Sequence, residues 1–146
     1  MAVQLDHTIV PAHDKEASAK FMAHIMGAEY PGLHGHFAPV RIGHIAFDFD
    51  NRENFVSNHY AFLVTEEEFD GIFGRIQASG YKYGSMPTAQ DDMQINTRHG
   101  GRGVYFKDAN GHSWEFGTVS YSFPGLKASD DPQGVAMPSS MAAAAR

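Results

Sequence analysis

The sequence predicts an α+β protein whose two similar halves pair into one cup-shaped mixed sheet, with helices on the outer face. Three observations lead to this prediction. Residues 7–27 and 59–80 each read as a strand, a helix and a stop glycine. About three further strands follow each helix. Each half alone has a sheet face that must be buried, and pairing the halves is the economical way to bury both.

The first half spans residues 4–50 and opens with an apolar strand that carries His7. Asp14 has the side chain of an N-cap, and Gly27 follows an apolar run at helical spacing, so a helix is expected between them. In the last strand of this half, apolar residues alternate with small or acidic ones such as Asp48. The expected elements are a strand at 5–10, the helix, and strands at 36–42 and 44–50.

A polar linker at 51–54 leads to the second half, which spans residues 55–120. Thr65 and Glu68 have the spacing of a capping box, and they open an apolar-periodic helix that Gly80 stops. The other expected elements are a strand at 58–64, a short strand at 81–85 and a long polar loop at 86–100. A loop of this length is typical of a functional or mobile segment.

A hairpin at residues 101–117 closes the second half. Asn110 and Gly111 are the pair that most readily forms a two-residue type I′ turn. On the return strand, the aromatic residues that begin at Trp114 point to one face and Glu115 points to the other. The acid therefore faces either water or a partner that carries positive charge.

The composition restricts the classes of function. With 146 residues and 42% hydrophobic residues, the chain can form one domain with a true core, expected at residues 1–121. The Pro-, Ser- and Ala-rich segment 122–146 is expected to be a poorly ordered tail. A net charge of −6 argues against nucleic-acid and anionic-membrane partners. No apolar run could span a membrane, no secretion signal is evident and cysteine is absent, so a cytoplasmic location is the simplest expectation.

His7 and His59 occupy equivalent places in the two halves, and Glu115 lies on the last strand. If a pseudo-twofold axis relates the halves, these side chains converge into two imidazoles and one carboxylate. Such a triad with open positions suits Fe²⁺, Mn²⁺ or a related divalent ion. The alternative is that each histidine is merely hydrogen-bonded or half-exposed, and that the glutamate is solvated. Most other histidines read as surface or turn residues; they are His13, His24, His34, His36, His44, His99 and His112.

Three segments resemble the vicinal oxygen chelate superfamily, which includes glyoxalase I, extradiol dioxygenases, and fosfomycin- and bleomycin-resistance proteins. They are Leu5-Asp-His-Thr-Ile-Val10, His59-Tyr-Ala-Phe-Leu-Val64 and Gly103-Val-Tyr-Phe-Lys-Asp-Ala-Asn-Gly-His-Ser-Trp-Glu-Phe116. The similarity covers roughly residues 4 to 120. It implies paired βαβββ modules, a cup-shaped sheet and a divalent metal on His7, His59 and Glu115.

The resemblance leaves the reaction open. A three-ligand site fits extradiol-type dioxygenases and fosfomycin-type transferases better than glyoxalases, which use a fourth acidic ligand. Asp48 is the candidate fourth ligand, although counting from the preceding glycine does not superpose it on Glu115. We therefore expect a metal-dependent, dioxygenase-like enzyme, by narrow preference over a lyase, isomerase or transferase. Fe²⁺ or Mn²⁺ is favoured, and Zn²⁺ or Ni²⁺ would indicate isomerase chemistry.

The substrate is expected to be a small molecule with two chelating oxygens. His99 and Arg102, with Arg98 beside them, are the candidates to hold an anionic or phenolic oxygen over the metal. Tyr105 is a weaker candidate, because strand alternation would turn it toward the helices. The competing hypothesis is a metal-free protein that sequesters a drug or metabolite, as bleomycin-resistance relatives do. A homodimer is compatible with either function.

Overall fold

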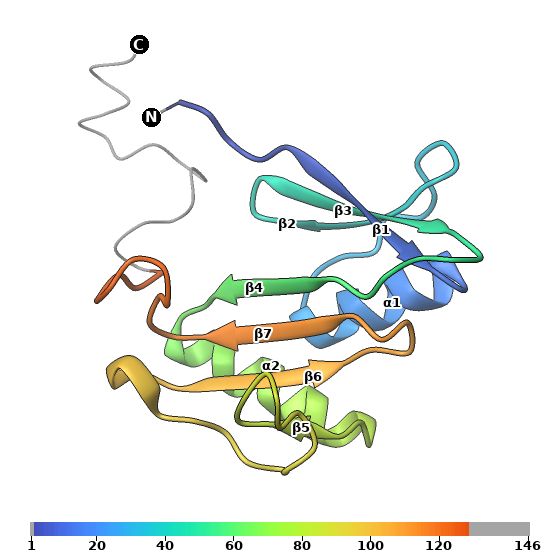
Figure 1. Cartoon of the computed structure of the whole chain (residues 1–146). Helices are drawn as coiled ribbons and strands as arrows, with labels where there is room; N and C mark the ends of the chain where they lie inside the picture. The colour runs from blue at the N-terminus through green and yellow to red at the C-terminus, as the bar shows by residue number, and fades with distance from the viewer. Residues whose placement is uncertain (1, 129–146) are drawn as a thin grey trace.

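The computed structural model describes residues 2–128 and contains two mixed sheets with two helices packed on one side (Figure 1). One sheet has the strand order β1-β3-β2 and the other β4-β7-β6-β5. The elements in chain order are β1 (His7–Ala12), α1 (Lys15–Met26), β2 (Ala38–Ile42), β3 (Ile45–Asn51), β4 (His59–Leu63), α2 (Glu66–Ser79), β5 (Tyr83–Gly84), the 3₁₀ turn η1 (Arg98–Gly100), β6 (Gly103–Lys107) and β7 (Ser113–Gly117). The predicted fold class is confirmed.

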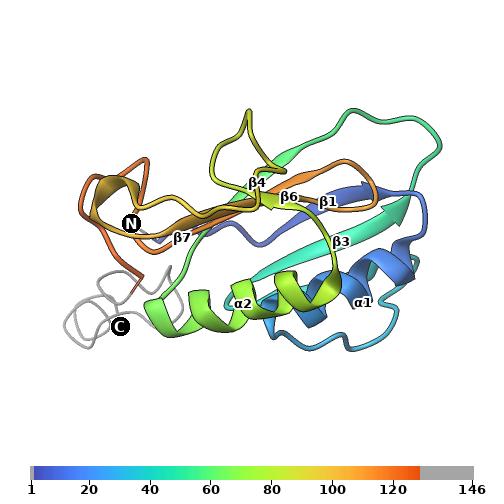
Figure 2. The ribbon, with the colours of Figure 1, turned by 90° about the horizontal axis from the view of Figure 1, so that it is seen from below.

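Both helices begin and end where the sequence predicts. The Asp14 carboxylate accepts a hydrogen bond from the Ala17 N–H, and Gly27 ends α1 with a φ of 68°. In α2, Thr65 and Glu68 form the reciprocal capping box. The helices lie side by side on the same side of the sheets (Figure 2). Within residues 2–128, neither helix is long and apolar enough to cross a membrane.

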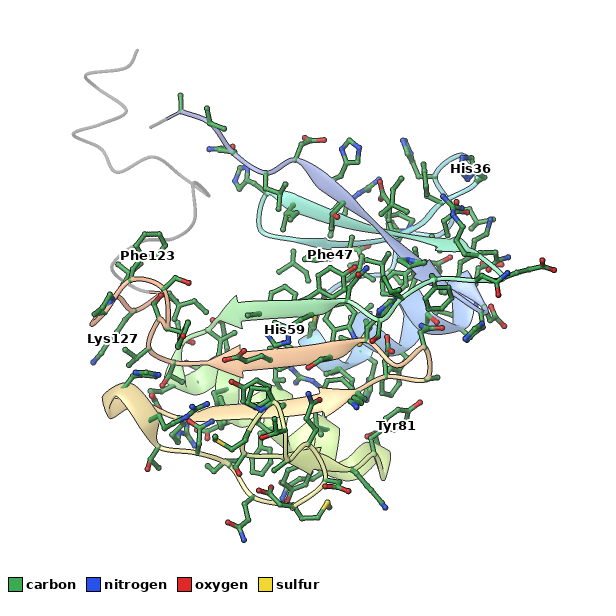
Figure 3. All side chains as sticks on the ribbon, viewed as in Figure 1. His36, Phe47, His59, Tyr81, Phe123 and Lys127 are labelled. Carbon is green, nitrogen blue, oxygen red and sulfur yellow. The ribbon has the colours of Figure 1, made fainter. Side chains whose placement is uncertain are left out.

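The strands expected at 36–42 and 44–50 are present as β2 and β3, so the first half has two strands after its helix where the repeat suggests about three. Glu29, in the connection before β2, makes an isolated antiparallel bridge with Arg41 of β2. The two halves do not share one continuous sheet, because each half forms a sheet of its own. Phe47 of β3 lies between the two sheets (Figure 3). Its ring contacts Tyr60 of β4 and Trp114 of β7 edge-on, with ring centroids 5.8 and 6.1 Å away. Aromatic side chains therefore connect the two sheets, and burying each large ring contributes about 2–3 kcal/mol.

The turn between β6 and β7 differs from the predicted type I′ turn. Only Gly111 of the Asn110-Gly111 pair has a positive φ, and the connection runs from residue 108 to residue 112. The buried Asp108 carboxylate organises it by accepting hydrogen bonds from the N–H groups of Asn110 and His112, each at 2.9 Å. It also accepts from the Trp114 indole N–H at 3.0 Å. The prediction of a two-residue turn was wrong: the Gly111 N–H donates to the Asp108 carbonyl at 3.0 Å, and the Asp108 carboxylate holds the longer connection from inside.

His112 lies in this connection, as expected of a turn residue, but it is fully buried and does not lie at the surface. Its Nδ1 accepts from the Asn58 N–H at 2.9 Å, which fixes the proton on Nε2. Nε2 then donates to the Pro11 carbonyl at 2.6 Å. One imidazole therefore connects the end of β1 to the residue that precedes β4, and holds the two halves together.

The segment after β7 turns back in a compact loop. The Ser120 N–H donates to the Leu126 carbonyl, and the Phe123 N–H donates to Ser120 Oγ, each at 2.9 Å. Tyr121 and Phe123 in this loop are exposed. The loop includes the first residues of the predicted tail, and residues 129–146 of that tail lie outside the described residues.

Candidate functional site

Strand register brings His59 and Glu115 together. In the parallel pair β4–β7, His59 lies opposite Ser113, and Ala61 lies opposite Glu115. Side chains alternate along a strand, so His59, Ser113 and Glu115 all project from one face. The buried residues Trp114 and Phe116 project from the other face. His59 Nε2 lies 3.0 Å from Glu115 Oε1, as two of the three predicted ligands require.

A cavity of about 730 Å³ opens over this face. His59 and Glu115 contribute its polar wall, with side chains that are 48% and 22% exposed. The remaining lining is predominantly apolar and comes from β4, the loop after β5, and the segment after β7. Its apolar and aromatic members include Ala61, Phe62, Leu63, Met86, Pro87, Tyr105, Val119, Tyr121, Phe123 and Leu126. Such a pocket suits a small, largely apolar organic molecule with a few polar groups.

Tyr105 lines this cavity, so the expectation that it faces the helices was wrong. In the antiparallel pair β6–β7 it lies directly opposite Glu115 and therefore shares its face. Burial raises the pKa of Tyr105 to about 12, and the charge and hydrogen bond of Glu115 act in the same direction. The phenol stays protonated at neutral pH and holds the carboxylate. Its oxygen also accepts from Arg98 Nη2 at 3.2 Å.

The positively charged side chain at the cavity wall belongs to Arg98. The two residues predicted to contact substrate lie elsewhere. His99 is exposed, with a φ of 59°, and its ring contacts Tyr121 edge-on at 5.7 Å. Arg102 forms ion pairs of 2.8 Å with Glu66 and with Asp70 of α2, which hold it outside the cavity lining. The structure thus brings Arg98, and neither His99 nor Arg102, to the cavity wall.

His7 lies on the other sheet and does not join His59 and Glu115 within the chain. Its side chain is 56% exposed, and Nδ1 bonds to the Asp6 carboxylate at 2.6 Å. That hydrogen bond raises the pKa of His7; burial opposes it, and the charges of Asp6 and Asp48 add smaller increases. Among residues 2–128, no three histidine or acidic side chains come close enough together to hold a metal ion.

Asp48 occupies the place in the first half that Glu115 occupies in the second. Ile9, two residues after His7, lies opposite Asp48, just as Ala61, two residues after His59, lies opposite Glu115. The expectation that the repeats do not superpose here was wrong. Counting from the preceding glycine misled because the turn before β3 is shorter than the 108–112 connection. Each sheet thus presents one histidine and one acid from the same relative positions.

Two related modules, each with a histidine and an acid at equivalent strand positions, define a paired-module α+β fold. Among solved structures, the protein described as oxidase ChaP-H2 is 47% identical, with a TM-score of 0.80, covering 86% of this chain and 100% of its own. Oxidase ChaP-H1 is 44% identical, with a TM-score of 0.79, covering 84% of this chain and 100% of its own.

A more distant solved structure, the fosfomycin resistance protein FosX from Mesorhizobium loti, is 21% identical. Its TM-score is 0.63, and it covers 84% of this chain and 97% of its own, which supports the fold alone. No protein-family model and no curated protein matches the sequence. The chain belongs to the vicinal oxygen chelate superfamily.

Proposed function

We propose that this protein is a metal-dependent oxidoreductase, dioxygenase-like, that acts on a small organic substrate with two neighbouring oxygens. The observation that carries the proposal is the His59 Nε2–Glu115 Oε1 pair, 3.0 Å apart, in the wall of a cavity of about 730 Å³. The identity of 47% with a protein described as an oxidase favours oxidation over the lyase, isomerase and transferase alternatives.

The donors fit a divalent ion of the Fe²⁺ or Mn²⁺ class. A neutral imidazole nitrogen and a carboxylate oxygen are two members of the two-histidine, one-carboxylate set. When bound, such an ion supplies adjacent open positions for oxygen donors and stabilises negative charge on them. Binding of Zn²⁺ or Ni²⁺ instead would favour isomerase or lyase chemistry, with Asp48 as a fourth ligand.

We propose that His7 of a second copy completes the set in a homodimer. His7 and Asp48 lie on one face of the first sheet, together with Ile9, which is 43% exposed. Leu5, just before β1, is 64% exposed. An apolar face with ligand-type side chains is complementary to an open cavity that holds the other two ligands. A symmetric dimer would make this contact twice and so build two sites.

The chain's own side chains would bind and orient the substrate. The Arg98 guanidinium is placed to hold an anionic or phenolic oxygen by a charge-assisted hydrogen bond. The protonated Tyr105 donates its hydroxyl to the Glu115 carboxylate and so holds it in place. The apolar wall excludes water and so strengthens these interactions.

A metal-free binding protein is the second candidate. It is favoured by one observation: within residues 2–128, two and not three of the predicted ligands come together. The apolar, aromatic cavity would then sequester a drug or metabolite without chemistry.

Metal content tests the proposal directly. Protein purified without added metal or chelator should contain near-stoichiometric iron or manganese, and the His59→Ala variant should contain little. Failure of the native protein to bind metal even after reconstitution would overturn the enzyme proposal and favour sequestration.

Mixing two defective variants tests the shared site. His7→Ala and Glu115→Ala proteins should each bind metal weakly. Subunit exchange between them should restore about a quarter of the wild-type metal content, because half of the dimers are mixed and each has one intact site. No restoration, with subunit exchange verified by mass-tagged chains, would exclude a site shared between copies.

A further inference from the structure

We propose that Ser113 and Gln90 are positioning residues that hold the His59 imidazole, an inference that rests on the proposed function. His59 uses Nε2 toward Glu115, and its other nitrogen, Nδ1, lies 3.2 Å from Ser113 Oγ. Ser113 Oγ in turn lies 2.9 Å from Gln90 Nε2 and 3.2 Å from Gln90 Oε1. A continuous hydrogen-bonded chain therefore runs from Glu115 to the long loop before β6.

The hydrogen bonds from His59 through Ser113 to Gln90 can form with either tautomer of the His59 imidazole. Because a carboxylate only accepts, Nε2 of His59 carries the proton while it faces Glu115, and Nδ1 accepts from the Ser113 hydroxyl. The Gln90 amide N–H then donates to Ser113. If Nε2 binds a metal ion, the proton resides on Nδ1, which donates to Ser113, and the hydroxyl donates to Gln90 Oε1. A hydroxyl and a primary amide each donate and accept, so the same contacts serve both tautomers.

The loop that carries Gln90 is held in place. Asp92 accepts hydrogen bonds from the Ser85 and Gln94 N–H groups, each at 3.0 Å. The Ala89 carbonyl packs so closely on Gly84 that a Cβ there would collide with it. Gln90 Nε2 also donates to the Pro87 carbonyl at 3.0 Å. A fixed amide can restrict the ring rotation of His59 more than solvent can.

This geometry also connects the imidazole to the substrate cavity. Met86, Pro87 and Thr88 line the cavity on the same loop as Gln90. A substrate that displaces this stretch would pull on the Gln90 amide, and through Ser113 on the orientation of His59. Ser113 and Gln90 are consequently expected to affect the affinity of the site for metal without contacting the metal.

Metal affinity is the first measurement. In titrations of metal-free protein with Zn²⁺ against a chelator of known affinity, Ser113→Ala should weaken the dissociation constant about tenfold or more, as is common for groups that orient a ligand histidine. Gln90→Ala should weaken it less, since Ser113 remains. Ser113→Thr restores a hydroxyl and should recover most of the affinity. Ser57→Ala, an exposed serine outside the cavity lining, is the matched control and should bind as the wild type does.

The second measurement needs no metal. In metal-free protein labelled with ¹⁵N-histidine, Ser113→Ala should shift the His59 imidazole nitrogen resonances, whereas Ser57→Ala should not. Unchanged His59 resonances in Ser113→Ala would refute the positioning role, whether or not metal binds. Equal affinity of Ser113→Ala and wild type for Zn²⁺ would refute it as well. Absence of Zn²⁺ binding by the wild type, with shifted resonances in Ser113→Ala, would instead refute the proposed function and leave the positioning role intact.

Discussion

Replacement of His112 by alanine should markedly lower the free energy of unfolding, although His112 lies outside the cavity lining. The change removes the acceptor for the Asn58 N–H and the donor for the Pro11 carbonyl. Each group left without a partner costs about 1–3 kcal/mol. The lost ring also packs against Phe55 and Tyr60, at centroid distances of 5.4 and 5.9 Å, which adds a cavity term of about 1 kcal/mol. We expect a loss of about 4 kcal/mol in the free energy of unfolding.

Urea denaturation at fixed protein concentration measures this loss. With a slope of about 2 kcal/mol per molar urea, the midpoint of His112→Ala should fall by about 2 M. His112→Gln keeps an acceptor and a donor and should lose less. His44→Ala, at an exposed turn position, should change the free energy of unfolding by less than about 0.5 kcal/mol. If the urea midpoints of His112→Ala and His44→Ala agree within experimental error, the imidazole does not connect the two halves as described.

Two further predictions concern charge. Burial alone would raise the pKa of Asp50, but hydrogen bonds and charges from Arg52 and His36 hold it below its ordinary value. The stabilisation from Asp50 is therefore fully present above that ordinary value and is lost as the pH falls through the lower, folded-state pKa. The gap in urea midpoint between wild type and Asp50→Asn should accordingly narrow between about pH 5 and pH 3, and a constant gap would contradict the assignment. At the cavity, Arg98→Met should weaken binding of 2,3-dihydroxybenzoate to zinc-loaded protein about tenfold, and binding of uncharged catechol less. Lys107→Met, on exposed β6 surface outside the cavity lining, is the control; equal losses for both probes would show that Arg98 does not recognise the anion.

Local sequence signals predicted both helices and the face of β7 from which Glu115 projects. Asp14, Gly27 and the Thr65–Glu68 pair act within one helical turn, so the nearby residues determine the result. Alternation along β7 likewise separated Glu115 from the buried Trp114 without knowledge of the fold.

Other features of the structure depend on contacts that sequence spacing does not reveal. His112 looks like a turn residue, yet it is buried because Pro11 of the first half and Asn58, just before β4, supply its hydrogen-bond partners. Arg102 resembles a substrate-binding arginine, but acidic residues of α2 hold it. Ser113 gave no signal beyond its position opposite His59, which requires the β4–β7 register. Strand parity, applied across both strands of a pair, would have found Tyr105.

The loop closed by Ser120 and Leu126 lies outside both repeated modules, yet its Tyr121 and Phe123 form part of the cavity wall. The modules supply His59 and Glu115 from strands that also build the core, so changes there compromise folding. The loop contributes little to the core, since the side chains of Tyr121 and Phe123 are 76% and 67% exposed. Substitutions at these two positions can consequently change the volume and shape of the cavity while the sheets, His59 and Glu115 stay intact. This separation gives the scaffold a route by which relatives can acquire new substrates without rebuilding the site.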